Sequence, residues 1–269
     1  MNQTTDKAGE KYWSSFWNIY GLPKPINIKD NGINNFPIQK FHETFKSIFS
    51  DDDKGKKILE IGCGNSVWLP YFAKQFELDV YGIDYSPLGV ETSELLLKRE
   101  NVNGTIIQSD LFNPPAELLN KFDFVISLGV VEHFTDTRNV IENISKFLKK
   151  DGLIITTVPN LTSINGYLQK KFFKPVYDIH VPLNKENLEN AHKIDGLRIL
   201  KSKYLVSFAI SIVLENAEKK AKNYQAKKII ALYLSRICKI FWLIEKTLKI
   251  KIPEKRTFAG NILTVAIKN

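Results

Sequence analysis

The feature that most constrains this chain is a regular alternation of short apolar runs and helical stretches. It starts at Lys56 and continues to about residue 160. Parallel strands need a crossover connection, usually a helix, so this alternation is typical of a parallel sheet covered by helices on both faces. We therefore expect an α/β fold with a doubly wound sheet. The expected strands are 57–61, 79–83, 104–108, 122–127 and 153–158, and the expected helices are 67–76, 87–99, 115–119 and 137–148.

The rest of the chain breaks this rhythm. Residues 11–40 are aromatic and irregular. Beyond residue 158 a long strand, or a strand that turns into a helix, is expected over 197–213, and a closing strand over 261–267. A loop is expected over 177–183, and further helices over 37–49, 161–173, 185–192, 215–224 and 227–250. We interpret the chain as one domain with an appended cap: an N-terminal aromatic lid and helix (1–55), a core (56–213), a helical insertion or cap (214–256) and the final strand of the core (257–269).

Composition excludes several other classes of protein. With 43% apolar and 12% aromatic residues, the chain has ample material for a core and is not disordered. Its two cysteines, Cys63 and Cys238, lie far apart, which favours unpaired thiols in a reducing compartment. Residues 1–10 lack the apolar stretch of a signal peptide, and the most apolar run, 229–244, is interrupted by Arg236 and Lys239. We expect a cytoplasmic protein, with peripheral contact to a membrane left open.

The net charge of +9 comes from a lysine-rich chain, because only five of its 38 basic residues are arginines. Arginine supplies the bidentate contacts to phosphate and guanine, so the composition argues against a nucleic-acid partner. A solvated basic surface is the simpler interpretation, and an anionic partner or membrane surface is the alternative.

A turn with two glycines follows the first expected strand. In the segment 58–66, Gly62 and Gly64 would let the backbone approach a ligand closely. Val67 occupies the third glycine position of a dinucleotide-binding fingerprint, and no phosphate-binding loop follows. Glu60 suits a ligand with a positive charge. A purely structural turn remains the alternative.

Acidic residues follow the next two strands. Asp84 is placed to accept hydrogen bonds from ribose hydroxyls, or else to cap the helix that starts at Pro87. Asp110 could accept from an adenine amine while Leu111 packs on the ring, or it could form a turn before Pro114.

The fourth strand leads into a polar pair, Glu132 and His133. The carboxyl edge of an open α/β sheet is where ligands bind. These four segments, in this order and spacing, resemble the class I S-adenosylmethionine-dependent methyltransferases, specifically the small-molecule subgroup with a Glu-His pair after strand four. The resemblance covers residues 56–160 well, and 176–200 and 257–269 more loosely.

The resemblance implies a Rossmann-like methyltransferase fold, mostly parallel with an antiparallel last strand, and S-adenosyl-L-methionine as cofactor. It places four groups of residues around that cofactor. Glu60, Gly62 and Gly64 would line the methionine end, Asp84 would hold the ribose, Asp110 and Leu111 the adenine, and Ser127 and Leu128 would lie under the sulfonium. Cys63 and Tyr85, from the same motifs, complete the candidate cofactor-binding set. Ser66 stands where a third glycine is common in the family.

Metal-dependent members of the family carry a second Glu three residues before the Glu-His pair, where this chain has Gly129. One His and one Glu are a poor ligand set, so we expect no metal. Methyl transfer depends mostly on positioning, and a hydroxyl acceptor also needs a general base. His133 and His180 are the candidate catalytic bases, although His133 could instead brace its loop. Trp13 and Tyr177 are candidate substrate residues, although the N-terminal aromatics could simply anchor the chain.

The resemblance implies a methyltransferase, which we expect to act on a small-molecule or a lipid- or glycan-linked acceptor, with O-methylation favoured. The alternatives are N- or C-methylation and a non-catalytic cofactor-binding partner module. No nucleic acid is expected as substrate, because no base-flipping motif follows strand four. The 227–250 helix has an apolar stripe and several basic residues. We expect it to cap the acceptor pocket with its basic face outward, and a homodimer contact or a peripheral membrane contact are the alternatives.

Overall fold

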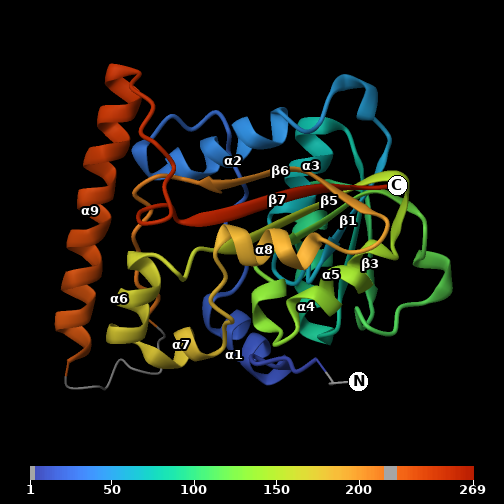
Figure 1. The fold of residues 1–269 in the computed structure, drawn as a ribbon, viewed down its shortest axis with the longest axis horizontal. Helices are drawn as coiled ribbons and strands as arrows, with labels where there is room; N and C mark the ends of the chain where they lie inside the picture. Colours follow the sequence, from blue (N-terminus) through green and yellow to red (C-terminus); the bar gives the residue numbers. More distant parts are fainter. Residues whose placement is uncertain (1–3, 215–222) are drawn as a thin grey trace.

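The computed structural model describes residues 4–214 and 223–269 (Figure 1). Seven strands form one sheet in the order β3-β2-β1-β4-β5-β7-β6. The five strands β1 to β5 are parallel, and β7 is antiparallel to both β5 and β6. The strands are β1 (Lys57–Ile61), β2 (Asp79–Asp84), β3 (Gly104–Gln108), β4 (Phe122–Leu128), β5 (Leu148–Pro159), β6 (Leu197–Leu205) and β7 (Asn261–Lys268). The predicted fold class, with its antiparallel last strand, is confirmed.

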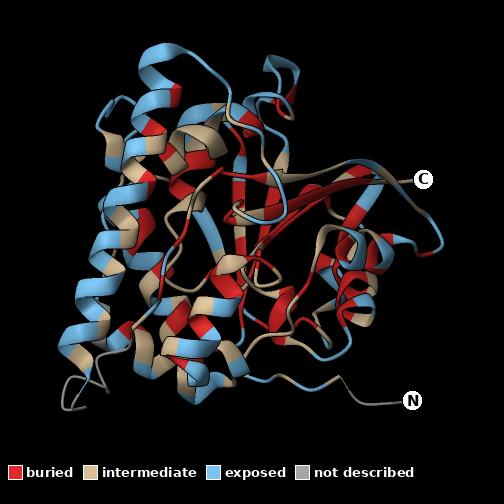
Figure 2. Ribbon diagram, turned by 60° about the vertical axis from the view of Figure 1, so that its left-hand side comes forward, coloured by how far each residue is buried: buried red, intermediate tan, exposed pale blue. Residues whose placement is uncertain are grey.

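Two apolar cores lie on the two faces of the sheet, because successive strand residues point to opposite sides. Leu59 of β1 and Val125 of β4 pack on the side of α5 (Thr137–Ser145) and α8 (Lys185–His192). Their neighbours in the strands face the other way, toward α2 (Phe36–Lys46), α3 (Trp68–Phe76) and α4 (Pro87–Arg99). Figure 2 shows the buried positions concentrated in the sheet and on the helix sides that face it.

Strong local signals explain why several elements match the sequence prediction. The helix α4 begins at Pro87, whose fixed φ suits a first turn, and Ser86 caps it by accepting a hydrogen bond from the Gly89 N–H at 3.4 Å. At α5 the Asp136 carboxylate caps Asn139 N at 3.0 Å. Both caps satisfy N–H groups that the helix itself leaves free.

Other segments differ from the prediction. The N-terminal aromatic residues form a helix, α1 (Glu10–Tyr20), because Trp13 and Trp17 are four residues apart and stack on one side of it. Residues 115–119 form only a 3-10 turn, η3 (Ala116–Leu118). The expected long strand ends at Leu205, since the backbone of Val206 turns to a φ of 61°.

The boundary between α5 and β5 is also shifted. The strand starts at Leu148, earlier than expected, and pairs there with Phe122 before an irregularity in the register. A short helix, α7 (Lys174–Asp178), takes the first residues of the expected 177–183 loop. The helix expected over 215–224 lies almost entirely outside the described residues.

The long helix α9 (Tyr224–Leu248) stands along one side of the molecule, beside α6 (Ile164–Phe172) (Figure 1). Its inner side packs into a third apolar cluster that contains Phe36, Ile210, Cys238 and Trp242. Cys63 and Cys238 are both buried free thiols. In the described ranges, no helix is long and apolar enough to cross a membrane.

Candidate functional site

A cavity of about 590 Å³ lies at the carboxyl ends of β1, β2 and β4. The loops that follow β1 to β4 form most of its wall, and α1 contributes Trp13 and Trp17. The crossover after β1 leads outward to β2, whereas the crossover after β4 leads to β5 in the opposite direction, so the cavity occupies the switch point between β1 and β4 of a doubly wound fold. Its other predicted lining residues are Gly62, Gly64, Asp84, Tyr85, Asp110, Leu111, Leu128 and His133.

The two glycines of the first loop permit close approach of other chain segments. Gly62 has a φ of 65°, and a Cβ atom there would lie 2.7 Å from Val130 Cγ2. A Cβ atom on Gly64 would lie 2.3 Å from the Trp17 ring. A side chain at either position would therefore push the cavity wall apart.

Asp84 ends β2 beside this loop and is buried. Its carboxylate accepts hydrogen bonds from Ser86 N at 2.8 Å and from Gly64 N at 2.9 Å. Burial raises the pKa of Asp84, although the two backbone hydrogen bonds act in the opposite direction. Ser86, and not Asp84, caps α4, so the capping alternative considered for Asp84 is wrong.

Buried polar atoms without a partner gather at the same edge. In the described part of the chain, five buried side-chain oxygens lack any hydrogen-bond partner. All five belong to β1, β4, β5 or the loops directly after β1 and β4. Each such atom costs free energy unless a ligand or water satisfies it. They are Glu60 Oε2, Asn65 Oδ1, Ser127 Oγ, Glu132 Oε2 and Thr157 Oγ1.

Burial strongly changes the pKa of Glu60, which lies at this edge. Its Oε1 accepts a hydrogen bond from Ser66 Oγ at 2.7 Å. Burial raises the pKa of Glu60 to about 8, and the negative charge of Asp84 adds to that effect against the Ser66 hydrogen bond. A cationic group beside the free Oε2 would favour the ionised form.

The far end of the cavity is formed by the loops after β2 and β3. Asp110 is exposed and accepts a hydrogen bond from Phe112 N at 2.9 Å, so the predicted turn is present alongside the contact with the cavity. Tyr85 Oη donates a hydrogen bond to Asp6 Oδ2 at 3.1 Å. This bond joins the loop after β2 to the N-terminal segment over the cavity.

His133 and His180 form a pair whose ring centroids are 4.4 Å apart. The Nδ1 atoms lie 2.9 Å from the Ile179 carbonyl oxygen and 2.6 Å from the Val176 carbonyl oxygen, respectively. A carbonyl can only accept, so each Nδ1 carries the proton and each Nε2 has a free lone pair. Burial, reinforced by His180, lowers the pKa of His133 to about 4, and burial also lowers the pKa of His180.

Glu132 completes a cluster with these two rings. Its Oε1 is 4.0 Å from His133 Nε2, and burial raises the pKa of Glu132 to about 8. One ligand atom from each of Glu132, His133 and His180 lies within 4.8 Å of the others, which is a spacing that could hold a divalent cation. The sequence showed only the first two of these ligands side by side.

Two predicted site residues do not contact the cavity. The Cys63 N–H donates to the Ile83 carbonyl, the Cys63 carbonyl accepts from Ser93 Oγ, and the thiol packs under Gly82, so the prediction that Cys63 binds the cofactor is corrected. Tyr177 lies in α7 with Lys170 Nζ over its ring, away from the cavity wall, so its predicted substrate contact is likewise unsupported.

Three other predicted residues, Glu60, Ser127 and His180, are likewise not among the residues that line the cavity. Sequence reasoning missed Trp17, Asp6 and Ser109, which do line the cavity. The spacing of Trp13 and Trp17 was a usable signal for the α1 face. Asp6 carried none, because it reaches the site only through the pairing of its segment with Phe134.

The predicted cap does not lie over this cavity. No residue of α9 lines it, since the helix packs instead on η1 (Ile33–Asn35), α2 and the segment after β6. Large apolar side chains of α9 face outward, whereas the prediction turned only its basic face outward. The cap prediction for 214–256 is therefore corrected for the described residues.

A family profile described as "Methyltransferase domain" matches residues 35–202. This match covers more than half of the chain, and the chain belongs to that family. The cofactor is S-adenosyl-L-methionine, and the protein is a methyltransferase.

Individual relatives agree with this assignment. A ubiquinone biosynthesis O-methyltransferase from Pelagibacter ubique is 28% identical over 230 residues, which cover 73% of this chain and 89% of that protein. A ribosomal protein L11 methyltransferase from Thermosipho africanus is 37% identical over 102 residues, but the match spans 38% of this chain and only 36% of that protein. The crystal structure of coclaurine N-methyltransferase, bound to N-methylheliamine and SAH, has a TM-score of 0.57 at 12% identity and covers 93% of this chain and 78% of that one.

Proposed function

We propose that this methyltransferase transfers a methyl group to an oxygen atom of a small-molecule or lipid-linked acceptor. The observation that carries the proposal is His133, which is 4% exposed and lines the cavity with a neutral ring and a free Nε2. An oxygen nucleophile must lose a proton, whereas an amine reacts in its neutral form, so a fixed base fits a hydroxyl acceptor best. The relative from Pelagibacter ubique carries O-methyltransferase in its name.

The residues of the carboxyl edge fit the cofactor. We propose that Asp84 accepts hydrogen bonds from its ribose hydroxyls, that Glu60 faces the methionine amine, and that Asp110 and Leu111 hold the adenine. The unpartnered oxygens of Glu60 and Ser127 support this placement, because a polar ligand would satisfy them. When bound, the cofactor supplies an electrophilic methyl group on a sulfonium.

The protein then has three tasks. The wall of the cavity, including Trp13 and Trp17, excludes water and aligns the acceptor with the methyl group. His133 Nε2 takes the acceptor proton, while the hydrogen bond of its Nδ1 to Ile179 holds the ring in place. The Glu132 carboxyl group, 4.0 Å from Nε2, is held mostly protonated by burial, and the positive charge of the imidazolium that forms would favour its ionisation and so be stabilised by it.

Turnover with a panel of acceptors tests the proposal. Release of S-adenosylhomocysteine would be measured with hydroxylated aromatic, sugar and lipid acceptors and with amines of matched size. With a ¹³C-methyl cofactor, the chemical shift of the transferred methyl group separates O-, N- and C-methylation. Turnover of the hydroxyl compounds alone is the expected result. Methylation of amines or carbon, or no turnover with any acceptor, would contradict it.

A further inference from the structure

The outer face of α9 is an unusual surface for a protein in water. Sixteen large apolar side chains are exposed in the described residues, and ten of them lie between residues 229 and 250. Their exposed fractions run from 36% to 62%. A contiguous apolar patch of this kind marks a contact surface. We call these ten the α9 apolar face: Ile229, Ile230, Leu232, Tyr233, Ile237, Ile240, Leu243, Ile244, Leu248 and Ile250.

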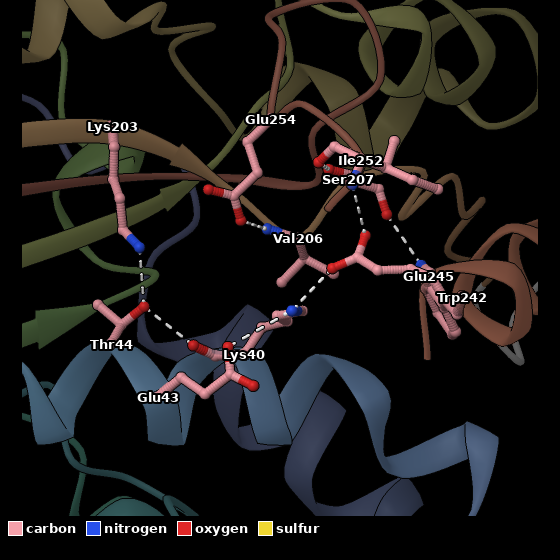
Figure 3. A network of polar contacts seen from close by, with 10 residues as sticks. All are labelled: Lys40, Glu43, Thr44, Lys203, Val206, Ser207, Trp242, Glu245, Ile252 and Glu254. Atoms are coloured by element: carbon pink, nitrogen blue, oxygen red, sulfur yellow. Dashed lines mark hydrogen bonds and ion pairs between the residues drawn. The ribbon is translucent and has the colours of Figure 1, made fainter. Parts of the chain in front are cut away.

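Polar contacts on the inner side fix the orientation of the helix (Figure 3). The Trp242 Nε1–H donates to the Ser207 carbonyl at 2.8 Å, and Glu245 forms an ion pair of 2.7 Å with Lys40 of α2. The second oxygen of Glu245 accepts from Ile252 N at 3.3 Å. Burial would lower the pKa of Lys40, but the hydrogen bond and charge of Glu245, together with Glu43, raise it. These contacts hold the opposite side of α9 against the domain, so the α9 apolar face points away from it.

The helix α9 carries a net positive charge. Its 25 residues include five basic side chains and one acidic one, Glu245, whose charge Lys40 already balances. Lys228, Lys239 and Lys246 project within about 20° of one another, along one edge of the apolar face, and the Lys246 ammonium also donates a hydrogen bond to the Asn31 carbonyl of the domain. Lys249 and Lys251 follow at the end of the helix. The face is thus an apolar strip about 30 Å long, with Arg236 within it and lysines along one border.

A second copy of the chain fits this face poorly. Two such helices packed antiparallel about a two-fold axis would meet near their midpoints, where Arg236 is exposed. The two arginines would then oppose each other, and neither helix has an exposed acidic residue to pair with the basic border. An anionic lipid surface suits both the apolar side chains and the lysines. Its acyl chains take up the apolar side chains, and its phosphates lie beside the lysines.

We propose that α9 lies flat on an anionic membrane surface through its apolar face, with Lys228, Lys239 and Lys246 at the level of the headgroups. Interfacial helices bind in this way through buried apolar area together with attraction to anionic lipids. The proposal is independent of which acceptor the enzyme methylates.

Co-sedimentation of the full chain with vesicles tests the proposal. We expect binding to vesicles of phosphatidylcholine with phosphatidylglycerol, and at least tenfold weaker binding to phosphatidylcholine alone or at high salt. The double variant Ile240→Asp/Leu243→Asp should lose at least tenfold in partitioning. The matched control, Leu95→Asp/Leu200→Asp, replaces two exposed apolar residues elsewhere and should bind like the unaltered protein.

Thermal unfolding and cofactor binding would show that each variant is folded. A third variant, Lys228→Gln/Lys239→Gln/Lys246→Gln, should bind anionic vesicles more weakly while its binding to neutral vesicles stays the same. Three results would overturn the proposal: no vesicle binding by the unaltered protein, equal binding by the α9 double variant, or a solution dimer that the α9 substitutions dissociate in the absence of lipid binding. The last of these would assign the face to a second copy.

Discussion

The carboxyl edge of the sheet and the outer face of α9 break opposite rules of protein structure. At the carboxyl edge, polar atoms such as Glu60 Oε2 and Ser127 Oγ are buried without partners. On α9, large apolar side chains such as Ile240 and Leu243 are exposed without partners. The first arrangement suits a small polar ligand, because such a ligand or a water molecule would satisfy polar atoms that gather at one edge of the sheet. The second needs an extended apolar surface, because its side chains follow one side of a long helix.

The two regions should also respond to different perturbations. Substitutions at the edge should change cofactor binding and turnover and leave vesicle binding unaltered. Substitutions on the α9 apolar face should do the reverse. The experiments below test this separation, beginning with the largest expected effect.

Replacing the proposed base should have the largest consequence. We expect His133→Asn to lower kcat by about 10²- to 10⁴-fold, the usual range for loss of a general base, with cofactor affinity nearly unchanged. Because the pKa of His133 is lowered to about 4, activity of the unaltered protein should not fall through the ordinary histidine range near pH 6.5 as the pH decreases. His180→Asn is the matched variant. A severe loss in His180→Asn with little change in His133→Asn would transfer the base role to His180.

Breaking the contact that mounts α9 should have the next largest effect. Glu245→Ala removes the shorter ion pair of the partly buried Lys40 and leaves it only Glu43 at 3.4 Å, and we expect the free energy of unfolding to fall by about 1.5–3 kcal/mol. The control is Glu142→Ala, which removes an exposed i,i+4 pair with Arg138 and should cost less than about 1 kcal/mol. Chemical denaturation measures both. Equal values for the two variants would show that the network of Figure 3 does not anchor the helix.

A smaller effect is expected from Glu60→Gln. The pKa of Glu60 is about 8 in the folded protein against an ordinary 4.5, so between these pH values the folded chain holds a proton that the unfolded chain loses. The stability of the cofactor-free protein therefore falls as the pH rises from 4.5 to 8. At pH 8 the variant should melt several degrees higher than the unaltered protein, and near pH 4.5 the two should agree.

The same substitution should weaken cofactor binding, because a neutral amide replaces the carboxylate that would face the methionine amine. Calorimetry in buffers of different ionisation enthalpy should also detect proton release when the unaltered protein binds the cofactor at pH 7. A variant that is neither more stable at pH 8 nor weaker in binding would remove Glu60 from the proposed site.

The smallest effect is expected from removal of metals. We expect turnover to survive exhaustive EDTA treatment, because a neutral His133 can act as base without a cation. The cluster of Glu132, His133 and His180 makes this a demanding test, since its geometry could hold a divalent ion. Activity lost to EDTA and restored by Mg²⁺ or Zn²⁺ would assign the cluster to a metal.

The sequence predicted best those elements whose bounds are set by residues only a few positions away. The strand at 57–61 and the helix at 87–99 have the predicted bounds, because apolar runs, Pro87 and the turn residues around them act within a few positions. The residues gathered at the carboxyl edge were also predictable, since parallel strands bring Gly62, Asp84 and His133 to the same end of the sheet.

The features that the sequence did not predict depend on contacts between segments that are far apart along the chain. His180 belongs beside His133 only because the chain after α7 returns to hydrogen-bond the ring, 46 residues further on at Ile179. Cys63 sits within the glycine motif, yet its thiol turns inward under Gly82. The amphipathic pattern of α9 was visible, but not which side faces the domain, because that follows from the pairing of Glu245 with Lys40.

The central claim is that the carboxyl edge holds the cofactor, and the affinity of Asp84→Ala for S-adenosyl-L-methionine tests it most directly. Loss of charge-assisted hydrogen bonds to the ribose, each worth about 1.5–3 kcal/mol, should weaken binding at least tenfold by calorimetry. Asp84→Asn guards against a folding defect, because it keeps an acceptor for the Gly64 N–H. Asp123→Ala, at the amino end of β4, is the matched control and should bind normally. Unchanged affinity in both Asp84 variants would contradict the account.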